Sequence, residues 1–155
     1  MKSEIQQLKA AYLEENRRKF PNLPQYARVC PKYTDKTANG LTKMILDFLR
    51  LYRHQAERIA VTGRYLDNSQ IVTDLVGRSR RIGSSKWIPG SMQPGTADIS
   101  AVIQGRAVKI EVKIGNDRQS EAQKRYQEQI ERAGGVYFIA TSFGQFYEWY
   151  ETLLK

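Results

Sequence analysis

The centre of this sequence is a pair of β-prone runs, Asp98-Ile-Ser-Ala-Val-Ile103 and Arg106-Ala-Val-Lys-Ile-Glu-Val-Lys113, joined by Gln104-Gly105. A glycine-containing pair between two such runs is typical of the tight turn of a β-hairpin. In the second run apolar and charged residues alternate, so one face of the strand is expected to be apolar and the other charged. The charged face would carry Lys109, Glu111 and Lys113.

Helical patterns flank this hairpin on both sides. Apolar residues recur at helical spacing from Leu41 to Tyr52, which predicts an amphipathic helix. We expect further helices over residues 120–132 and 143–154, and strands over residues 58–62 and 136–141. Because a helix separates the hairpin from the last strand, that strand is expected to pair in parallel. The sequence therefore predicts an α/β domain with a mixed sheet flanked by helices.

The N-terminal part is predicted to be a helical extension. Residues 3–19 form a polar helical pattern that Pro21 and Pro24 end, and residues 25–40 look irregular. We therefore divide the chain into an extension, 1–38, and one folded domain, 39–155. Within that domain, residues 64–96 are rich in Gly, Ser, Asp, Asn and Pro, which predicts a loop, with a short hairpin as a further option.

The charge of the chain is strongly basic and unevenly distributed. The formal net charge is +9 over 155 residues. Residues 1–38 carry +4 and residues 78–113 carry +5, whereas residues 39–77 carry +1 and residues 114–155 carry −1. A basic surface attracts polyanions, so nucleic acid is the first partner expected and an anionic membrane surface the second.

Several function classes are excluded by composition. The sequence contains no run of about 20 apolar residues, the length needed to cross a bilayer. One histidine, His54, and one cysteine, Cys30, are too few for a zinc finger within the chain. A single cysteine cannot form an internal disulfide, which fits a reducing cytoplasm.

The best candidate for chemistry is the set Asp98, Glu111 and Lys113. Asp98 opens the first strand of the hairpin, so its carboxylate can lie beside that of Glu111 on the second strand. Neighbouring carboxylates repel each other and normally need a cation between them, and Mg²⁺ suits such a site. A bound Mg²⁺ can activate water and neutralise charge on a phosphodiester, while Lys113 stabilises the transition state. The alternative is that Asp98 caps a turn while Glu111 and Lys113 form a solvated pair.

Four motifs together resemble the PD-(D/E)XK nuclease superfamily, and within it the virus-type replication-repair nuclease (VRR-NUC) domain. They are Gly95-Thr96-Ala97-Asp98, Glu111-Val112-Lys113, Gln123, and Ala133-Gly134-Gly135-Val136-Tyr137-Phe138-Ile139. The resemblance covers about residues 39–150 by element order and is specific over about residues 95–145. It implies a restriction-endonuclease-like fold and a Mg²⁺- or Mn²⁺-dependent nuclease of phage or bacterial replication, recombination or repair. Branched or junction DNA is then an attractive substrate, and a homodimer an option.

The resemblance also implies roles for single residues. Asp98 and Glu111 would be metal ligands, helped by the backbone carbonyl of Val112. Lys113 would be the catalytic lysine, and Gln123 would orient the substrate or the lysine. For Gln123 an alternative stands beside this, since Ser120-Glu-Ala-Gln123 also matches a capping box at a helix start.

Two positions depart from the family pattern. Ala97 stands where the family often has proline. Members also commonly place a Glu in the first helix, whereas here that helix starts Asn39-Gly-Leu-Thr-Lys and has no Glu at its head. The nearest acids are Asp47 and Glu57, and Asn39 could offer only a neutral oxygen.

A basic segment upstream of Asp98 is the candidate for gripping nucleic acid. Arginines pair with phosphates and a tryptophan can stack on a base. The candidate residues are Arg78, Arg80, Arg81, Lys86 and Trp87, with Arg118 as a further phosphate contact. The alternative is a solvated loop with its tryptophan folded onto the core, and for Arg118 an ion pair at a helix start.

Two other functions remain open at this point. One is a nucleic-acid-binding module that has the nuclease fold but no catalysis. The other is a basic scaffold protein. A nuclease is expected to cleave only with metal, a binding module to bind with a salt-dependent affinity, and a scaffold to do neither.

Overall fold

The computed structural model describes residues 3–59, 63–88 and 93–155, which divide into two compact units. The larger unit consists of residues 1–59 and 94–155, and the smaller unit of residues 60–93. The helices of the larger unit are α1 (Glu4–Lys19), α2 (Ala38–Leu51), α3 (Glu121–Arg132) and α4 (Phe143–Leu153), with a 3-10 turn at Gln25–Ala27. Its strands are β1 (Gln55–Arg58), β6 (Ile99–Ile103), β7 (Arg106–Val112) and β8 (Val136–Ala140).

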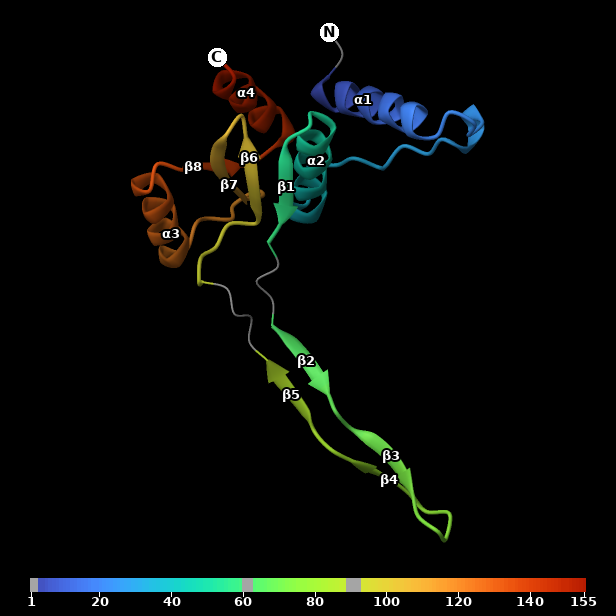
Figure 1. Ribbon diagram of the computed structural model, residues 1–155. Coiled ribbons are helices and arrows are strands. Elements are labelled where there is room, and N and C mark those ends of the chain that lie inside the picture. Colours follow the sequence, from blue (N-terminus) through green and yellow to red (C-terminus); the bar gives the residue numbers. More distant parts are fainter. Residues whose placement is uncertain (1–2, 60–62, 89–92) are drawn as a thin grey trace. The chain divides into compact units, whose positions relative to one another are not determined.

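The larger unit is built on a four-stranded sheet with the order β1-β6-β7-β8 (Figure 1). β1 and β7 both pair antiparallel with β6, whereas β8 pairs in parallel with β7. The prediction of a mixed α/β sheet is therefore confirmed. The predicted hairpin turn is also present: Gln104 and Gly105 have φ angles of 48° and 79°, the left-handed conformations that a two-residue hairpin turn requires.

One face of this sheet is covered by α2 and α4, which form the main core. The apolar side of β7, with Val108, Ile110 and Val112, is buried there. Phe48 of α2 lies at the centre, with its ring against the rings of Phe146 and Tyr150 of α4. Burial of such aromatic side chains contributes a large share of the hydrophobic stabilisation of a domain.

The N-terminal extension packs onto the same core. Leu8 of α1 is 1% exposed and belongs to the main cluster of buried residues. Ser3 caps α1 by accepting a hydrogen bond from the amide of Gln6. Residues 3–19 are therefore a fixed part of the larger unit. In the part of the chain that the structure describes, no helix is both long and apolar enough to span a membrane.

The opposite face of the sheet is covered by α3 at one end (Figure 1). A second apolar cluster fills this contact and consists of Ala97, Tyr126 and Tyr137, with Ile130 and Ile139 packed against it. Gly95 lies against the start of α3 with a φ of 85°, and a side chain there would collide with the carbonyl of Ala122. Only glycine therefore allows the segment before Asp98 to pass this close to the helix.

Two element boundaries differ from the sequence-based expectation. α2 begins at Ala38, so Asn39 and Gly40 lie in its first turn and do not precede it. The reason is the cap: the hydroxyl of Thr37 accepts a hydrogen bond from the amide of Gly40. The first strand, expected over residues 58–62, is instead β1 at Gln55–Arg58, and residues 60–62 lie outside the described part.

The smaller unit is a β-ribbon. Its strands are β2 (Arg64–Asp67), β3 (Gln70–Thr73), β4 (Ser79–Ile82) and β5 (Ser85–Ile88). β2 pairs antiparallel with β5, and β3 with β4. The sequence predicted a loop in this segment, with a short hairpin as a further option, and the structure shows the hairpin. Its two ladders need few apolar residues, which explains why a composition typical of turns hides them.

Candidate active site

Asp98 is fixed at the entrance of β6 by bonds to both neighbouring strands. Its carbonyl oxygen accepts a hydrogen bond of 2.8 Å from the amide of Ile59, which follows β1. Its carboxylate oxygen Oδ2 accepts one of 2.9 Å from the amide of Val112, the last residue of β7. The side chain of Asp98 is therefore held against the end of β7 and does not extend freely into solvent.

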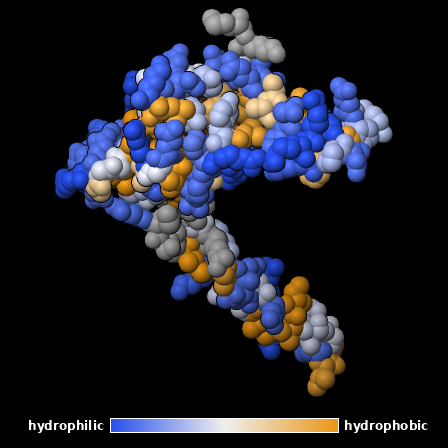
Figure 2. Space-filling view, turned by 45° about the horizontal axis from the view of Figure 1, so that its top comes forward, coloured by the Kyte–Doolittle hydropathy of each residue, from blue (hydrophilic) through white to orange (hydrophobic). Residues whose placement is uncertain are grey.

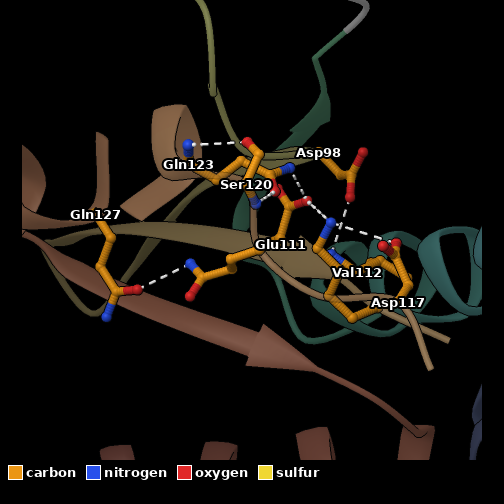
Figure 3. A network of polar contacts seen from close by, with 9 residues as sticks. Asp98, Glu111, Val112, Asp117, Ser120, Gln123 and Gln127 are labelled. Carbon is orange, nitrogen blue, oxygen red and sulfur yellow. Dashed lines mark hydrogen bonds and ion pairs between the residues drawn. The ribbon is translucent and has the colours of Figure 1, made fainter. Parts of the chain in front are cut away.

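Glu111 lies one residue earlier on β7, on the face that α3 covers, and is only 3% exposed. Its Oε1 atom accepts a hydrogen bond from the side-chain amide of Gln123 and lies 3.2 Å from the Nζ atom of Lys113 (Figure 3). Its other oxygen, Oε2, is buried and has no hydrogen-bond partner among the described residues. A buried carboxylate oxygen without a donor is costly, so this position calls for a further positive partner.

The surroundings of Glu111 disfavour its ionised form. Burial raises the pKa of its carboxyl, and the charge of Asp98 raises it further, to about 7, although Lys113 acts in the opposite direction. Two carboxylates that repel each other in this way are the arrangement that a divalent cation relieves. The alternative of a solvated pair on an exposed sheet face is wrong, since Glu111 and Lys113 are 3% and 9% exposed.

Lys113 lies between two acids at the end of β7. Its Nζ atom is 3.2 Å from Glu111 Oε1 and 3.3 Å from Asp117 Oδ2. Burial lowers the pKa of Lys113, but the hydrogen bonds to Glu111 and Asp117 outweigh it, and the pKa is raised overall. The two acids therefore favour the charged form of the amine, which can stabilise negative charge.

Gln123 forms the capping box that its sequence context predicts, and its side chain also contacts Glu111, whereas the predicted role of orienting the substrate or the lysine stays a prediction. The side-chain oxygen Oε1 of Gln123 accepts a 2.9 Å hydrogen bond from the backbone amide of Ser120. The backbone amide of Gln123 donates to Ser120 Oγ at 3.3 Å. These two bonds form the predicted capping box at the start of α3. Its Nε2 atom meanwhile donates to Glu111, so the same side chain caps the helix and orients the carboxylate.

The donor set at this site fits a small divalent cation. It offers the carboxylates of Asp98 and Glu111, with Glu111 Oε2 unpaired, while the contact of Val112 with Asp98 is through its backbone N–H, which donates to Asp98 Oδ2. Mg²⁺ binds through one or two carboxylates and fills its remaining positions with water and substrate oxygens. No group of three His, Cys, Asp or Glu suited to a metal is found within residues 3–59, 63–88 and 93–155.

The residues considered for the missing first-helix ligand have other partners or positions. The side-chain oxygen of Asn39 accepts a 2.8 Å hydrogen bond from Arg58. Asp47 accepts hydrogen bonds from the hydroxyl of Tyr33 and from Lys43. Glu57 is exposed on β1, opposite Ser100 of β6. The structure therefore brings together Asp98, Glu111, Lys113 and Gln123, but no third carboxylate ligand from α2.

The candidate nucleic-acid contacts lie elsewhere. Arg118 is exposed in the turn between β7 and α3 and makes no ion pair that the described residues show, so the alternative of an ion pair at the helix start is not observed for it. The other candidates belong to the smaller unit. Arg78, Arg80, Arg81, Lys86 and Trp87 are all exposed there. Trp87 is 48% exposed and contacts the ring of Tyr65, so it does not fold onto the core.

Two further residues belong to the site and were not assigned to it from sequence. Asp117 holds Lys113 from a turn four residues downstream. Tyr137 lies on β8 on the face of Glu111, where burial raises the pKa of its hydroxyl and the charge of Glu111 raises it further. The parallel register that pairs Glu111 with Ile139 places Tyr137 there, and this pairing was the only signal that could have identified it.

Comparison with known proteins adds no family assignment to this geometry. The chemistry of the site therefore has to be inferred from its own residues. Neither a scan against protein-family models nor a search of curated proteins finds a match to this chain.

Proposed function

We propose that this protein is a metal-dependent nuclease with a restriction-endonuclease-like fold of the PD-(D/E)XK type, which hydrolyses phosphodiester bonds in DNA. The observation that carries the proposal is the buried carboxylate of Glu111, which has one oxygen unpaired and lies beside both Asp98 and a protonated lysine. A purely structural ion pair would satisfy both oxygens of a buried carboxylate. The unpaired oxygen supports a site made for a cation.

The residues of the site divide the work of hydrolysis between them. Asp98 and Glu111, with the backbone oxygen of Val112, would hold Mg²⁺ or Mn²⁺. Such an ion supplies an activated water and neutralises charge on the phosphate. Lys113, protonated and fixed between two acids, stabilises the negative charge that develops on the phosphorane oxygens. Gln123 holds one oxygen of Glu111 by its side-chain amide and leaves the other oxygen unpaired.

The charge of the chain supports a nucleic-acid substrate. The net charge of +9 favours association with a polyanion, and the exposed arginines of the smaller unit make no ion pairs among the described residues. We further propose a role in phage or bacterial replication, recombination or repair, in the cytoplasm, with branched or junction DNA as substrate and a homodimer as the working form. These last points rest on the resemblance of the Gly95–Asp98, Glu111–Lys113 and Gln123 motifs alone.

The experiment that tests the proposal is cleavage of labelled DNA. Single-stranded, duplex, flap and four-way-junction DNA, and a matched RNA, are incubated with Mg²⁺, Mn²⁺ or EDTA. Glu111→Gln and Asp98→Asn are compared with wild type. Glu128→Gln is the matched control, because Glu128 is an exposed acid on α3. We expect metal-dependent cleavage by wild type and the control, and none by the two site variants.

The outcome that would contradict the proposal is binding without cleavage under every metal condition. The protein would then be a nucleic-acid-binding module that shares the nuclease fold. Cleavage that persists in both site variants would instead place the catalytic centre elsewhere.

A further inference from the structure

The smaller unit is one continuous hairpin. The register of β2 with β5 pairs Tyr65 with Trp87, and that of β3 with β4 pairs Ile71 with Arg81. The pairing of β3 with β4 continues the register of the pairing of β2 with β5, so the four strands form a single two-stranded ribbon. Between them the amide of Asn68 still donates to the carbonyl of Ser84, at 3.4 Å. A two-stranded ribbon by itself is only marginally stable in water, and a partner that binds it adds to its stability.

The end of the ribbon is a preformed turn. The carboxylate oxygen Oδ1 of Asp74 accepts hydrogen bonds from the amides of Val76 and Arg78, at 3.0 and 2.8 Å. Gly77 completes the turn with a φ of 80°. This turn presents two aliphatic side chains to solvent: Leu75 is fully exposed and Val76 is 80% exposed. Figure 2 shows hydrophobic atoms along the ribbon and at its end.

Basic side chains follow directly behind this apolar tip. Arg78, Arg80, Arg81 and Lys86 are exposed and form no ion pair among the residues that the structure describes. The two acids of the same stretch accept hydrogen bonds from backbone amides. Asp74 accepts one from Arg78 in the turn, and Asp67 accepts one from Ser69. The ribbon therefore keeps its positive charge available for a polyanion.

The distribution of side chains argues against a protein partner. Ile71 and Val72 lie on opposite faces of β3, and each stands directly opposite an arginine of β4, Arg81 and Arg80 respectively. Other exposed apolar side chains also lie along the ribbon, so each face mixes apolar with basic side chains and is not purely apolar; they are Tyr65, Ile82, Trp87 and Ile88. Arginines on both faces instead suit a groove, which is bordered by a phosphate backbone on each side.

We propose that the hairpin of residues 65–88 is an arm that enters a groove of double-stranded DNA and inserts Leu75 and Val76 between neighbouring base pairs. A two-stranded β-ribbon fits a DNA groove, and apolar wedges inserted at a base step unstack and kink the duplex. Arg80 and Arg81 contact the flanking phosphates. The inference rests on the proposed function only for the nature of the partner, since insertion by the arm does not require cleavage.

The test measures binding and base unstacking separately. Duplex DNA with 2-aminopurine at its centre is titrated with protein in EDTA, so that no cleavage occurs. We expect wild type to bind and to raise the 2-aminopurine fluorescence. Leu75→Ser/Val76→Ser should still bind but lose the rise in fluorescence. Arg80→Gln/Arg81→Gln should bind more weakly, and the slope of log affinity against log salt should fall by about 2.

Matched controls lie in the larger unit. Val29→Ser removes an equally exposed aliphatic side chain, and Arg17→Gln/Lys19→Gln removes the same charge from an exposed helix. Thermal melts are compared for all variants, and because the substituted side chains are exposed, the melts should coincide. The proposal is overturned if the tip variant unstacks the duplex as wild type does, or if the arginine variant weakens binding no more than the control on α1.

A third result would also overturn it. If wild type sediments as a dimer, the tip variant as a monomer, and DNA binding is equal in both, then the tip joins two copies of this chain. If the protein unstacks DNA but does not cleave it with any metal, the proposed nuclease activity is refuted and the proposed insertion of the arm into DNA is supported. The two proposals can therefore fail independently.

Discussion

Replacing Glu111 by glutamine should change how the stability of the metal-free protein depends on pH. Burial and the charge of Asp98 raise the pKa of Glu111 from 4.5 to about 7. The folded protein therefore holds a proton on Glu111 at a pH where the unfolded chain has released it. A raised folded-state pKa contributes stability that is complete below the unfolded value and is lost as the pH rises through the folded value. The loss falls between pH 4.5 and about pH 7.

The size of the effect follows from these two values. Linkage gives a loss of about 2 to 3 kcal/mol in the free energy of unfolding between about pH 5 and pH 8. Glutamine has no proton to lose, so Glu111→Gln should not show this loss. Its amide oxygen can still accept the hydrogen bond from Gln123, so the orientation of the side chain is retained.

The assay is urea unfolding of wild type and Glu111→Gln in EDTA at a series of pH values. The quantity compared is the difference between the two proteins, which cancels groups that titrate in both. His54 is one such group, because its pKa is lowered by burial and its effect has the opposite sign. The free energy of unfolding of the variant should rise by about 2 to 3 kcal/mol relative to that of wild type from about pH 5 to pH 8. If the free energies of unfolding of the two proteins change in parallel with pH, the reasoning that Glu111 is a destabilised carboxylate is refuted.

Four further predictions follow from the same geometry. Mg²⁺ at 100 times its dissociation constant should stabilise wild type by about 2.7 kcal/mol, measured by urea unfolding, and should leave Asp98→Asn unchanged. Lys113→Met should lower the cleavage rate by about 100-fold or more, with Lys113→Arg recovering part of it, because the variant removes a charge that stabilises the transition state. Gln123→Glu should retain the helix cap but lose cleavage and some thermal stability, because a second carboxylate would then face the buried Glu111, whereas Gln123→Ala should lose about 1 kcal/mol from the cap. Gly95→Ala should lower the free energy of unfolding, measured with urea, by about 1 to 3 kcal/mol, since it imposes both a strained backbone and a collision with α3. Equal stability of Gly95→Ala and wild type would show that the loop can move away from the helix.

The parts of the fold that sequence predicts well are those with strong local patterns. The β6–β7 hairpin follows from alternation and its turn, and α3 from a capping motif and its terminal glycines. β1 could not be placed, because Gln55, Glu57 and Arg58 are polar and the strand exists through its pairing with β6. The ribbon of the smaller unit was obscured in the same way. Its strands lack a buried face, and burial is what gives a strand its recognisable alternation.

The candidate site divides along the same line. Asp98 and Glu111 come together because they lie on paired strands of one local hairpin, which the sequence predicts directly. Asp117 and Tyr137 join them through a turn and through parallel pairing with β8, which depend on how distant segments pack. The unpaired oxygen of Glu111 is a property of the packed site and has no counterpart in the sequence.

The position of Gln123 imposes an unusual limit on substitution. Helix caps of this kind accept either glutamine or glutamate at the third helical position. Here the same side chain must also donate a hydrogen bond to Glu111, and an ionised glutamate has no hydrogen to donate. Asparagine has the right groups but is one methylene shorter. A position that a cap alone would leave open to two residues is thereby restricted to one, because a substitution by glutamate would keep the helix cap but lose the hydrogen bond to Glu111.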